Sequence, residues 1–319
     1  MTLGDLGEFG FIDRLRERLP AGTAKVGVGD DAAVVRPTEG TSLVATTDAL
    51  VEGVHFRWDW SKPPDVGHKA VTVNVSDLAA MGARPRWVLI TIGAPSSTAQ
   101  ATLEGIYDGL DEACVDYDVE LIGGDTVRAE ELVLSVTALG EVDGEPLLRS
   151  GAKIGDVLAV TGPLGRAAAG VNLLLSQNVK GISPEDALAC MSAHARPTAR
   201  VAEGRALRMS AHAAIDLSDG LAPDAGRLAQ ASNVGVEIEV VPVADEARRV
   251  AEARGWEVER MTLGGGEDYE LLVALDASSV DELDLGLIPV GRVVDDGVWL
   301  VRDGERHPLD ATGWDHFQS

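Results

Sequence analysis

Acidic residues recur beside glycine, serine or threonine at the ends of short apolar segments, and this pattern is where the sequence could perform chemistry. The segment AIDLSDGLAPD at 214–224 places Asp216, Asp219 and Asp224 close together. Carboxylates this close repel each other unless a cation, a proton or bulk water lies between them. Five further segments share the pattern: VGVGDDAAVV (26–35), ATTDALVEGVHF (45–56), NVSDLAAMGA (74–83), LIGGDTVR (121–128) and LGGGEDYEL (263–271).

These acidic segments favour a site for hard cations. Mg²⁺ takes oxygen ligands in an octahedron and commonly bridges carboxylates to substrate phosphates. The segments contain no paired His or Cys, which favours Mg²⁺ over Zn²⁺. The neighbouring glycines would let backbone N–H groups approach phosphate oxygens. Taken singly, however, Asp beside Gly is more often a turn and Asp before a helix is more often a cap.

Familiar nucleotide and hydrolase motifs do not account for these segments. The sequence contains no GxxxxGK[ST], HExxH or GxSxG, so neither a P-loop nor these hydrolytic sites are indicated. Gly27, Gly29 and Ala32 do satisfy G-x-G-x-x-A. Asp30 and Asp31 would then face a pyrophosphate, and the chain continues as a strand, so the dinucleotide interpretation is rejected.

Short β-branched runs alternate with helix-like stretches, which predicts a mixed α and β chain. The segment 63–85 is predicted to be helical, because Pro64 can open a helix and Gly82 can close one. A helix would place Asn74 and Asp77 on one face. The alternating valines at 71, 73 and 75 leave a strand as the alternative. The predicted strands are SLVATT (42–47), WVLITIG (87–93), LVLSVTALGEV (132–142) and DVLAVTG (156–162).

The segment LLRSGAKIGD at 147–156 is the predicted domain boundary, because two glycines and a polar cluster separate two strand-like runs. We therefore expect one domain over 1–148 and a second over 149–319. Arg149 at this junction and Arg128 after the GGD sequence could each offer a guanidinium fork to a phosphate. A solvated surface position is the commoner fate of a single arginine, and it stays open for both.

Composition bounds the class of protein. The 319 residues suffice for two domains, and the net charge of −25, from 52 acidic residues against 27 Lys plus Arg, argues against a nucleic-acid partner. An acidity that serves only solubility is the alternative to cation binding. Cys114 and Cys190 lack CxxC spacing, and neither a leader-like N-terminus nor an 18-residue apolar run is present. We expect a cytoplasmic protein without a membrane partner.

The acidic segments and their flanks together resemble the thiamine-monophosphate kinase family over nearly the whole chain. The combination of DALVEGVHF, IDLSDGL and GGEDYEL is specific to that family, whereas GDD, GGD and the SDL helix are similar to motifs of a wider superfamily. That superfamily includes aminoimidazole ribonucleotide synthetase, selenophosphate synthetase and hydrogenase-maturation proteins. The matching segments also include GEFGFIDRL (7–15), VNVSDLAAMGARP (73–85), RSGAKIGD (149–156) and GWDHF (313–317).

The resemblance implies an α/β (α+β) chain with the two-domain aminoimidazole ribonucleotide synthetase-like fold. Its N-terminal domain, 1–148, would carry a mixed sheet with helices, bind ATP and Mg²⁺, and pair with a second copy in a homodimer. Its C-terminal α/β domain, 149–319, would complete the substrate site. ATP and several Mg²⁺ ions would lie in a cleft lined by the acidic segments.

Motif matches carry the family's functional positions onto this sequence. Thr46 stands where the family often has Ser, and either hydroxyl can bind Mg²⁺. Asp30 and Asp224 receive no assignment, and Asp224 is expected to be a helix cap or an exposed side chain. The implied metal ligands are Asp31, Thr46, Thr47, Asp48, Asp77, Asp125, Asp216 and Asp219. The implied ATP contacts are Tyr107, Gly124, Asp125, Arg149 and Ser218, and the implied thiamine phosphate contacts are His55, Glu267 and Trp314.

The implied reaction is a direct in-line transfer of the γ-phosphoryl group of ATP to thiamine monophosphate. The acceptor phosphate is already mostly dianionic at neutral pH, so no general base is expected. Two alternatives remain open. One is another ATP-dependent enzyme of the superfamily, such as an amidine-forming ligase or a hydrogenase-maturation protein. The other is a non-catalytic protein that binds divalent cations.

Overall fold

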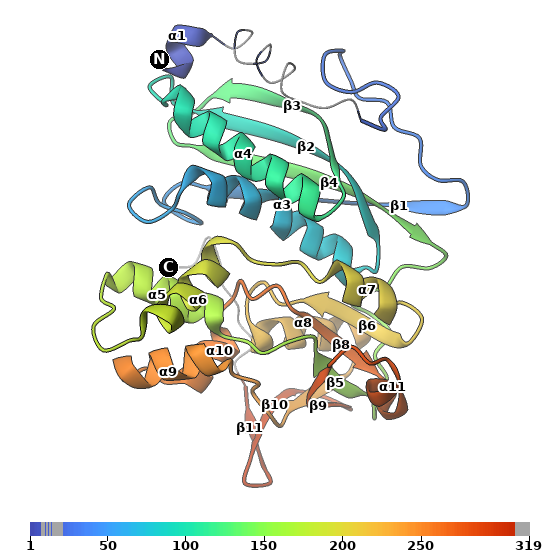
Figure 1. Ribbon diagram of the computed structural model, residues 1–319. Helices are drawn as coiled ribbons and strands as arrows, with labels where there is room; N and C mark the ends of the chain where they lie inside the picture. The colour runs from blue at the N-terminus through green and yellow to red at the C-terminus, as the bar shows by residue number, and fades with distance from the viewer. Residues whose placement is uncertain (8–9, 11, 13, 15–21, 310–319) are drawn as a thin grey trace. The chain divides into compact units, whose positions relative to one another are not determined.

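The structure, a computed structural model, describes residues 1–319 except 8–9, 11, 13, 15–21 and 310–319. The chain forms two compact units, coloured in sequence in Figure 1. The first unit comprises Met1–Leu78 and Ala83–Glu145, and the second comprises Ala79–Gly82 and Pro146–Ser319. The functional assignment of 1–148 and 149–319 stays a prediction. No helix in the described part of the chain is long and apolar enough to cross a bilayer.

The first unit is a four-stranded sheet in the order β1-β4-β2-β3, with helices packed against it (Figure 1). β2 and β3 are parallel and are joined through a helix, and the other neighbours are antiparallel. The strands are β1 (Thr41–Val51), β2 (Arg84–Ala94), β3 (Glu120–Arg128) and β4 (Val133–Asp143). The helices are α1 (Leu3–Leu6), α3 (Pro63–Ala80) and α4 (Gln100–Asp116).

Alternation along the strands sets which face of this sheet is buried. In β4, Leu134, Val136 and Ala138 are buried, whereas the residues between them are half-buried. α3 and α4 pack together closely because Gly67 and Gly109 have no side chains. A Cβ at either position would collide with the backbone of the other helix. The predicted helix is confirmed by α3 as far as Ala80, whereas Arg84 and Pro85 already belong to β2. The four predicted strands are confirmed by β1, β2, β4 and β5 (Val157–Val160).

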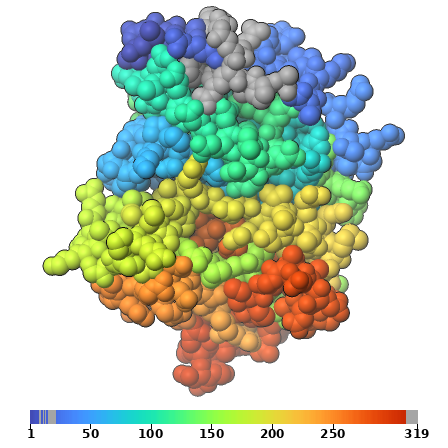
Figure 2. Space-filling model, viewed as in Figure 1, coloured from blue at the N-terminus to red at the C-terminus, as the bar shows by residue number. Residues whose placement is uncertain are grey.

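The second unit is built on a seven-stranded mixed sheet in the order β11-β10-β7-β9-β5-β8-β6. Besides β5, its strands are β6 (Ala211–Asp216), β7 (Gly235–Ile238), β8 (Leu271–Leu275), β9 (Ile288–Val294), β10 (Val298–Arg302) and β11 (Glu305–Pro308). Its helices are α5 (Arg166–Ser176), α6 (Pro184–Ala195), α7 (Val201–Leu207), α8 (Leu221–Ser232), α9 (Asp245–Arg254), α10 (Val258–Gly264) and α11 (Ala277–Glu282). The β10–β11 hairpin projects from the rest of this unit (Figure 2).

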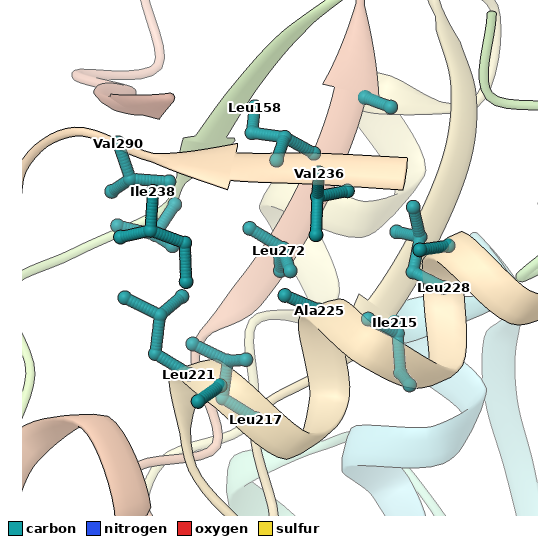
Figure 3. Close-up of a cluster of buried hydrophobic side chains, with 14 of the residues drawn as sticks. Leu158, Ile215, Leu217, Leu221, Ala225, Leu228, Val236, Ile238, Leu272 and Val290 are labelled. Carbon is teal, nitrogen blue, oxygen red and sulfur yellow. The ribbon is translucent and has the colours of Figure 1, made fainter. Parts of the chain in front are cut away.

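The centre of the second unit's sheet is buried on both faces. Successive residues of β8 alternate between two hydrophobic clusters, with Leu272 in one and Leu271 and Val273 in the other. This arrangement explains why β8 reads as a continuous apolar run. α8 covers one face, and its Leu221 and Ala225 point toward strand residues of the first cluster (Figure 3). The burial of Leu221 fixes the turn that precedes α8.

Candidate functional site

In the first unit, β1 and α3 bring together four residues whose side chains offer oxygen atoms to a metal ion. Three are predicted ligands, Thr46, Asp48 and Asp77, and the fourth is their neighbour Asn74. The Thr46 hydroxyl donates a hydrogen bond of 2.6 Å to Asp77 Oδ2, and the backbone N–H of Asp48 donates one of 2.9 Å to Asn74 Oδ1. Asn74 and Asp77 are three residues apart on α3, so one helix face serves both contacts. The predicted shared face of Asn74 and Asp77 is confirmed.

The electrostatics of this cluster fit a cation. Partial burial raises the pKa of Asp48 above its ordinary value, and the nearby carboxylate of Asp77 raises it further. Both causes disfavour a second negative charge at this point, and a divalent cation would remove the penalty. Hydroxyl, amide and carboxylate oxygens are the donors that Mg²⁺ prefers. The residues present therefore fit Mg²⁺.

The register of the sheet separates the other predicted ligands of the first unit from this cluster. Asp48 lies in one row with Val136, Ile90 and Gly124, whereas Asp125 lies in the next row. Because side chains alternate along a strand, Asp125 points to the opposite face from Asp48. Thr47 also points to that opposite face, where its hydroxyl accepts a hydrogen bond of 3.2 Å from the Thr137 hydroxyl.

Asp31 lies in an exposed loop whose ends are held by two glutamates. Asp31 is exposed, and its backbone N–H donates to Asp30 Oδ1 at 2.8 Å. Before the loop, Glu120 accepts hydrogen bonds from the backbone N–H and hydroxyl of Thr23. After the loop, Glu141 accepts in the same way from Thr38. Neither glutamate was predicted from the sequence, although an acidic residue in an otherwise apolar strand such as β4 was an available signal.

Two further predicted contacts of the first unit have definite places. Nδ1 of His55 accepts a hydrogen bond of 3.0 Å from the Val51 N–H, so the neutral ring carries its proton on Nε2. Tyr107 is 4% exposed within α4 and contributes to the core of the unit. The structure shows the ring in a packing role, and its contact with ATP stays a prediction.

In the second unit, two predicted segments meet along a ladder of backbone hydrogen bonds. The Leu217 N–H donates to Glu270 O at 2.8 Å, and the Tyr269 N–H donates to Leu217 O at 3.0 Å. The Glu267 N–H then donates to Ser218 O at 2.9 Å. This ladder continues the pairing of β6 with β8 beyond the strand ends. It places the predicted ATP contact Ser218 next to the predicted substrate contact Glu267.

The segment 264–270 is fixed by a separate partner for each of its acidic residues. Glu267 Oε2 lies 2.7 Å from Nδ1 of the buried His194. Asp268 accepts a hydrogen bond of 2.8 Å from the Gly165 N–H at the start of α5, and burial raises its pKa to about 7. Glu270 is paired with Arg200 and accepts from the Thr161 hydroxyl at 2.6 Å.

Backbone strain accompanies these contacts. Glu267 has φ 71° and Tyr269 has φ 52°, and both values lie in the left-handed region that non-glycine residues rarely adopt. The contacts of the acidic side chains hold the backbone there. Strain retained in this way is typical of segments that position functional groups.

The opening segment of the sequence forms a three-residue ionic cluster. Asp219 Oδ2 and Asp224 Oδ1 each lie 2.5 Å from Nη1 of Arg227. Burial raises the pKa of Asp224 to about 6. Asp216 ends β6 and is 3% exposed. Of the two alternatives for Asp224, exposure is wrong, because the residue is fully buried. The helix-cap alternative is confirmed: Asp224 Oδ2 accepts the N–H groups of Asp219 and of Gly220, the N-cap residue of α8.

Arg149 and Arg128 are both exposed, which is compatible with either surface solvation or a ligand contact. The backbone carbonyl of Arg149 accepts a hydrogen bond of 3.1 Å from the Ser232 hydroxyl. Trp314 lies outside the described residues.

Among the described residues, one group has metal-ligand spacing that the sequence analysis missed: Asp156, His212 and Asp276. Nδ1 of His212 lies 2.9 Å from Asp156 Oδ2, and its Nε2 lies 2.8 Å from the ammonium nitrogen of Lys153. The cation in this group is therefore the lysine itself, and we assign the group a structural role. Its members come from segments far apart in sequence, so no local spacing signalled it.

Comparison with known proteins identifies the family. Two family models match, AIR synthase related protein, N-terminal domain, over residues 29–142, and its C-terminal domain over 153–284. The thiamine-monophosphate kinase of Mycobacterium tuberculosis (strain ATCC 25618 / H37Rv) is 41% identical over 322 residues, which cover 99% of this chain and 93% of that protein. The thiamine-monophosphate kinase of Escherichia coli (strain K12) is 39% identical over 325 residues, with 98% of each chain covered.

The fold agrees with this similarity. The solved structure of AaThiL complexed with AMPPCP and TMP superimposes with a TM-score of 0.81 at 37% identity and covers 99% of both chains. The predicted two-domain fold class is confirmed by this match and by the two domain models. The chain therefore belongs to the thiamine-monophosphate kinase family of AIR synthase related proteins.

Proposed function

We propose that this chain transfers the γ-phosphoryl group of ATP to thiamine monophosphate. An oxygen of the acceptor phosphate bonds to the γ-phosphorus, the bond to the β–γ bridging oxygen breaks, and thiamine diphosphate and ADP leave. The observation that carries the proposal is the full-length similarity to AaThiL, whose structure was solved with AMPPCP and TMP. The oxygen-rich cluster of Thr46, Asp48 and Asp77 supports it, because phosphoryl transfer needs positioned charge.

The chemistry of the acceptor explains why the site needs no general base. The second pKa of a phosphate monoester is near 6, so the acceptor is mostly dianionic at neutral pH. The protein's task is then to position two anions and to offset their repulsion. At about 4 Å and an effective dielectric of about 20, two like charges repel by roughly 4 kcal/mol.

Mg²⁺ is the proposed means of offsetting this repulsion. When bound, it would supply charge neutralisation and orientation of the phosphates. In the first unit Thr46, Asp48 and Asp77 would hold it, since the Thr46 hydroxyl contacts the Asp77 carboxylate and the Asp48 carboxylate is close enough to feel its charge. Asp216 and Asp219 of the second unit are proposed as further ligands. Asp31, Thr47 and Asp125 stay proposed ligands, and Tyr107, Gly124, Arg149 and Ser218 stay proposed ATP contacts.

The proposed recognition of thiamine uses charge. The thiazolium ring is a cation, and Glu267 would attract it. Its carboxylate lies next to His194, and its side chain is 26% exposed, which leaves room for a ligand. His55 and Trp314 are proposed as further contacts, with the indole of Trp314 offering a ring face to the cation.

A coupled assay of the purified chain tests the proposed function. Incubation with ATP, MgCl₂ and thiamine monophosphate should give equal amounts of ADP and thiamine diphosphate, separated by chromatography. ADP formation that does not depend on thiamine monophosphate would favour another ATP-dependent enzyme. Mg²⁺ binding without any nucleotide turnover would favour a non-catalytic cation-binding protein.

Glu267→Gln is expected to raise the KM for thiamine monophosphate roughly tenfold, since a partly buried charge pair contributes on the order of 1 kcal/mol. The KM for ATP should change little. Steady-state kinetics with each substrate varied in turn measure both values. Glu282→Gln, an exposed glutamate on α11, is the matched control. Equal increases in both KM values would contradict the proposed contact between Glu267 and thiamine.

The proposal also covers the oligomeric state of the protein and its compartment in the cell. We propose a homodimer formed through the sheet of the first unit, whose second face carries half-buried and exposed residues such as Leu43 and Thr91. We also propose the cytoplasm as the compartment. Cys114 and Cys190 are both free thiols, and a reducing compartment would keep them so.

A further inference from the structure

Arg227 contacts two carboxylates of the segment that precedes and opens α8. Its Nη1 lies 2.5 Å from Asp219 Oδ2 and 2.5 Å from Asp224 Oδ1. Asp224 is the fixed member of the group. It is fully buried, and its other oxygen accepts the N–H groups of Asp219 and Gly220 at 2.9 and 3.1 Å. The guanidinium is therefore held from one side by a carboxylate that cannot turn toward water.

Asp219 is held differently. Its side chain is 26% exposed, and the side chain of Arg227 is 37% exposed, so water and ions can reach their contact. The guanidinium forms an ion pair with one of the two carboxylate oxygens of Asp219. Arginine keeps its positive charge at every accessible pH, so it is a permanent competitor for any other cation at that oxygen.

The two carboxylates also differ in what they can lose. A buried carboxylate that loses its counter-ion incurs a large desolvation penalty, whereas an exposed one is solvated. Arg227 can therefore give up Asp219 while keeping Asp224. The i,i+3 spacing of Asp224 and Arg227 on α8 maintains the second contact whatever happens to the first.

We propose that Arg227 is the built-in counter-ion of Asp219, and that a divalent cation binds there by displacing the guanidinium from Asp219 while Arg227 stays paired with Asp224. Arg227 thereby sets the concentration of divalent cation at which the cation binds to Asp219. The inference rests on the proposed function in one respect, the assignment of Asp219 as a metal ligand. It gives Arg227 a positioning role that no motif match assigned to it.

Binding of Mn²⁺, which shares the octahedral oxygen preference of Mg²⁺, tests the inference without any nucleotide. Calorimetry and electron paramagnetic resonance on the full chain would follow wild type, Arg227→Gln, Asp219→Asn and the double variant. Arg227→Gln should tighten Mn²⁺ binding about fivefold, the upper end for a partly exposed ion pair. The effect should vanish in the Asp219→Asn background, which isolates the pair from other cation sites.

Two further variants keep the test decisive. Arg227→Lys leaves a cation beside the buried Asp224 but shortens the reach toward Asp219, so it should fold and tighten Mn²⁺ binding by about two- to threefold. Arg249→Gln is the matched control, because Arg249 is also a helix arginine paired with an aspartate, Asp186 at 2.6 Å, away from the cluster. It should leave Mn²⁺ binding unchanged.

Unchanged or weaker Mn²⁺ binding in both Arg227 variants would overturn the inference, as would an equal effect in the Asp219→Asn background. Its failure is distinguishable from failure of the proposed function. If the wild-type chain does not phosphorylate thiamine monophosphate, yet the Arg227 variants bind Mn²⁺ more tightly than wild type, the proposed function is refuted and the counter-ion role of Arg227 stands. If the wild-type chain is active but the Arg227 variants bind Mn²⁺ no more tightly than wild type, the function stands and the counter-ion role is refuted.

Discussion

Asp48→Asn is expected to lower kcat for the phosphorylation of thiamine monophosphate by about two orders of magnitude or more while leaving the fold intact. The substitution removes the charge of a proposed Mg²⁺ ligand beside Thr46 and Asp77, and loss of such a ligand costs at least that much in metal-dependent transfer. The contact of its backbone N–H with Asn74 is retained, because it involves no side-chain atom of residue 48. Saturating kinetics over a range of MgCl₂ concentrations measure the effect.

The stability of this variant separates a metal ligand from a structural residue. The pKa of Asp48 is raised in the folded state, so its ionisation lowers folding stability as the pH rises above the unfolded-state pKa. Asp48→Asn removes this cost. In metal-free buffer at pH 8 the variant should therefore unfold at a temperature equal to or above that of wild type, although its kcat is strongly lowered.

The control for Asp48→Asn is Asp143→Asn, an exposed position at the far end of the same β1–β4 pair. It should retain wild-type kinetics. Near-normal turnover of Asp48→Asn would contradict the assignment of Asp48 as a metal ligand. A large fall in its melting temperature would show instead that Asp48 serves the fold.

The features that were predictable from sequence are those with local causes. The helix at 63–80 forms in spite of the valine alternation. It begins with two prolines, and most of its residues from Val66 onward are buried, so alternation between a buried and an exposed face is not required. Once it is a helix, the spacing of Asn74 and Asp77 fixes their shared face. Short β-branched runs likewise predicted β2 and β4. In each case the signal lies within the segment itself.

The features that were not predictable depend on partners far away in the chain. Asp268 caps α5 through the Gly165 N–H, about a hundred residues earlier, and only the packed second unit brings them together. Glu120 and Glu141 hold the loop of Asp31 across similar separations. No local pattern encodes such pairs, because the same letters are compatible with a turn, a cap or a surface charge.

The register of the first sheet shows a second limit of sequence reasoning. The segments with Asp48 and Asp125 look alike in sequence, since each ends an apolar run in aspartate beside small residues. A shift of one position along a strand reverses the face to which a side chain points. The pairing of β2 with β3 includes a register irregularity after Val88, and the rows that result place the two aspartates on opposite faces. Only the structure decides this.

The closeness of the segments 217–219 and 264–270 in the second unit makes Gly266 a sensitive position outside the proposed ligands. A Cβ at Gly266 would collide with the carbonyl oxygen of Ser218 and lie 3.0 Å from Cα of Asp219. Both obstacles are backbone, which cannot move aside as a flexible side chain would. The hydrogen bond from Glu267 to Ser218 would have to lengthen or break.

Gly266→Ala is therefore expected to lower the free energy of unfolding by on the order of 1–3 kcal/mol, the usual cost of overpacking. It should also lower kcat/KM for thiamine monophosphate by about 100-fold, because a displacement near 1 Å of Ser218 and Glu267 is enough for such a loss. Thermal unfolding and steady-state kinetics measure the two effects. At a temperature well below the melting point, the kinetic loss should persist in fully folded protein.

Gly264→Ala is the matched control, two residues earlier in the chain. A Cβ at Gly264 would meet no atom within 4 Å, and the residue ends α10, where Ala is a better helix former than Gly. This variant should be as stable as wild type or slightly more stable, with unchanged kinetics. If Gly266→Ala behaved in the same way, the backbone ladder between the two segments would not be what positions Ser218 and Glu267. The difference between the variants thus isolates the contact of Gly266 with Ser218 from the general effect of replacing glycine in this segment.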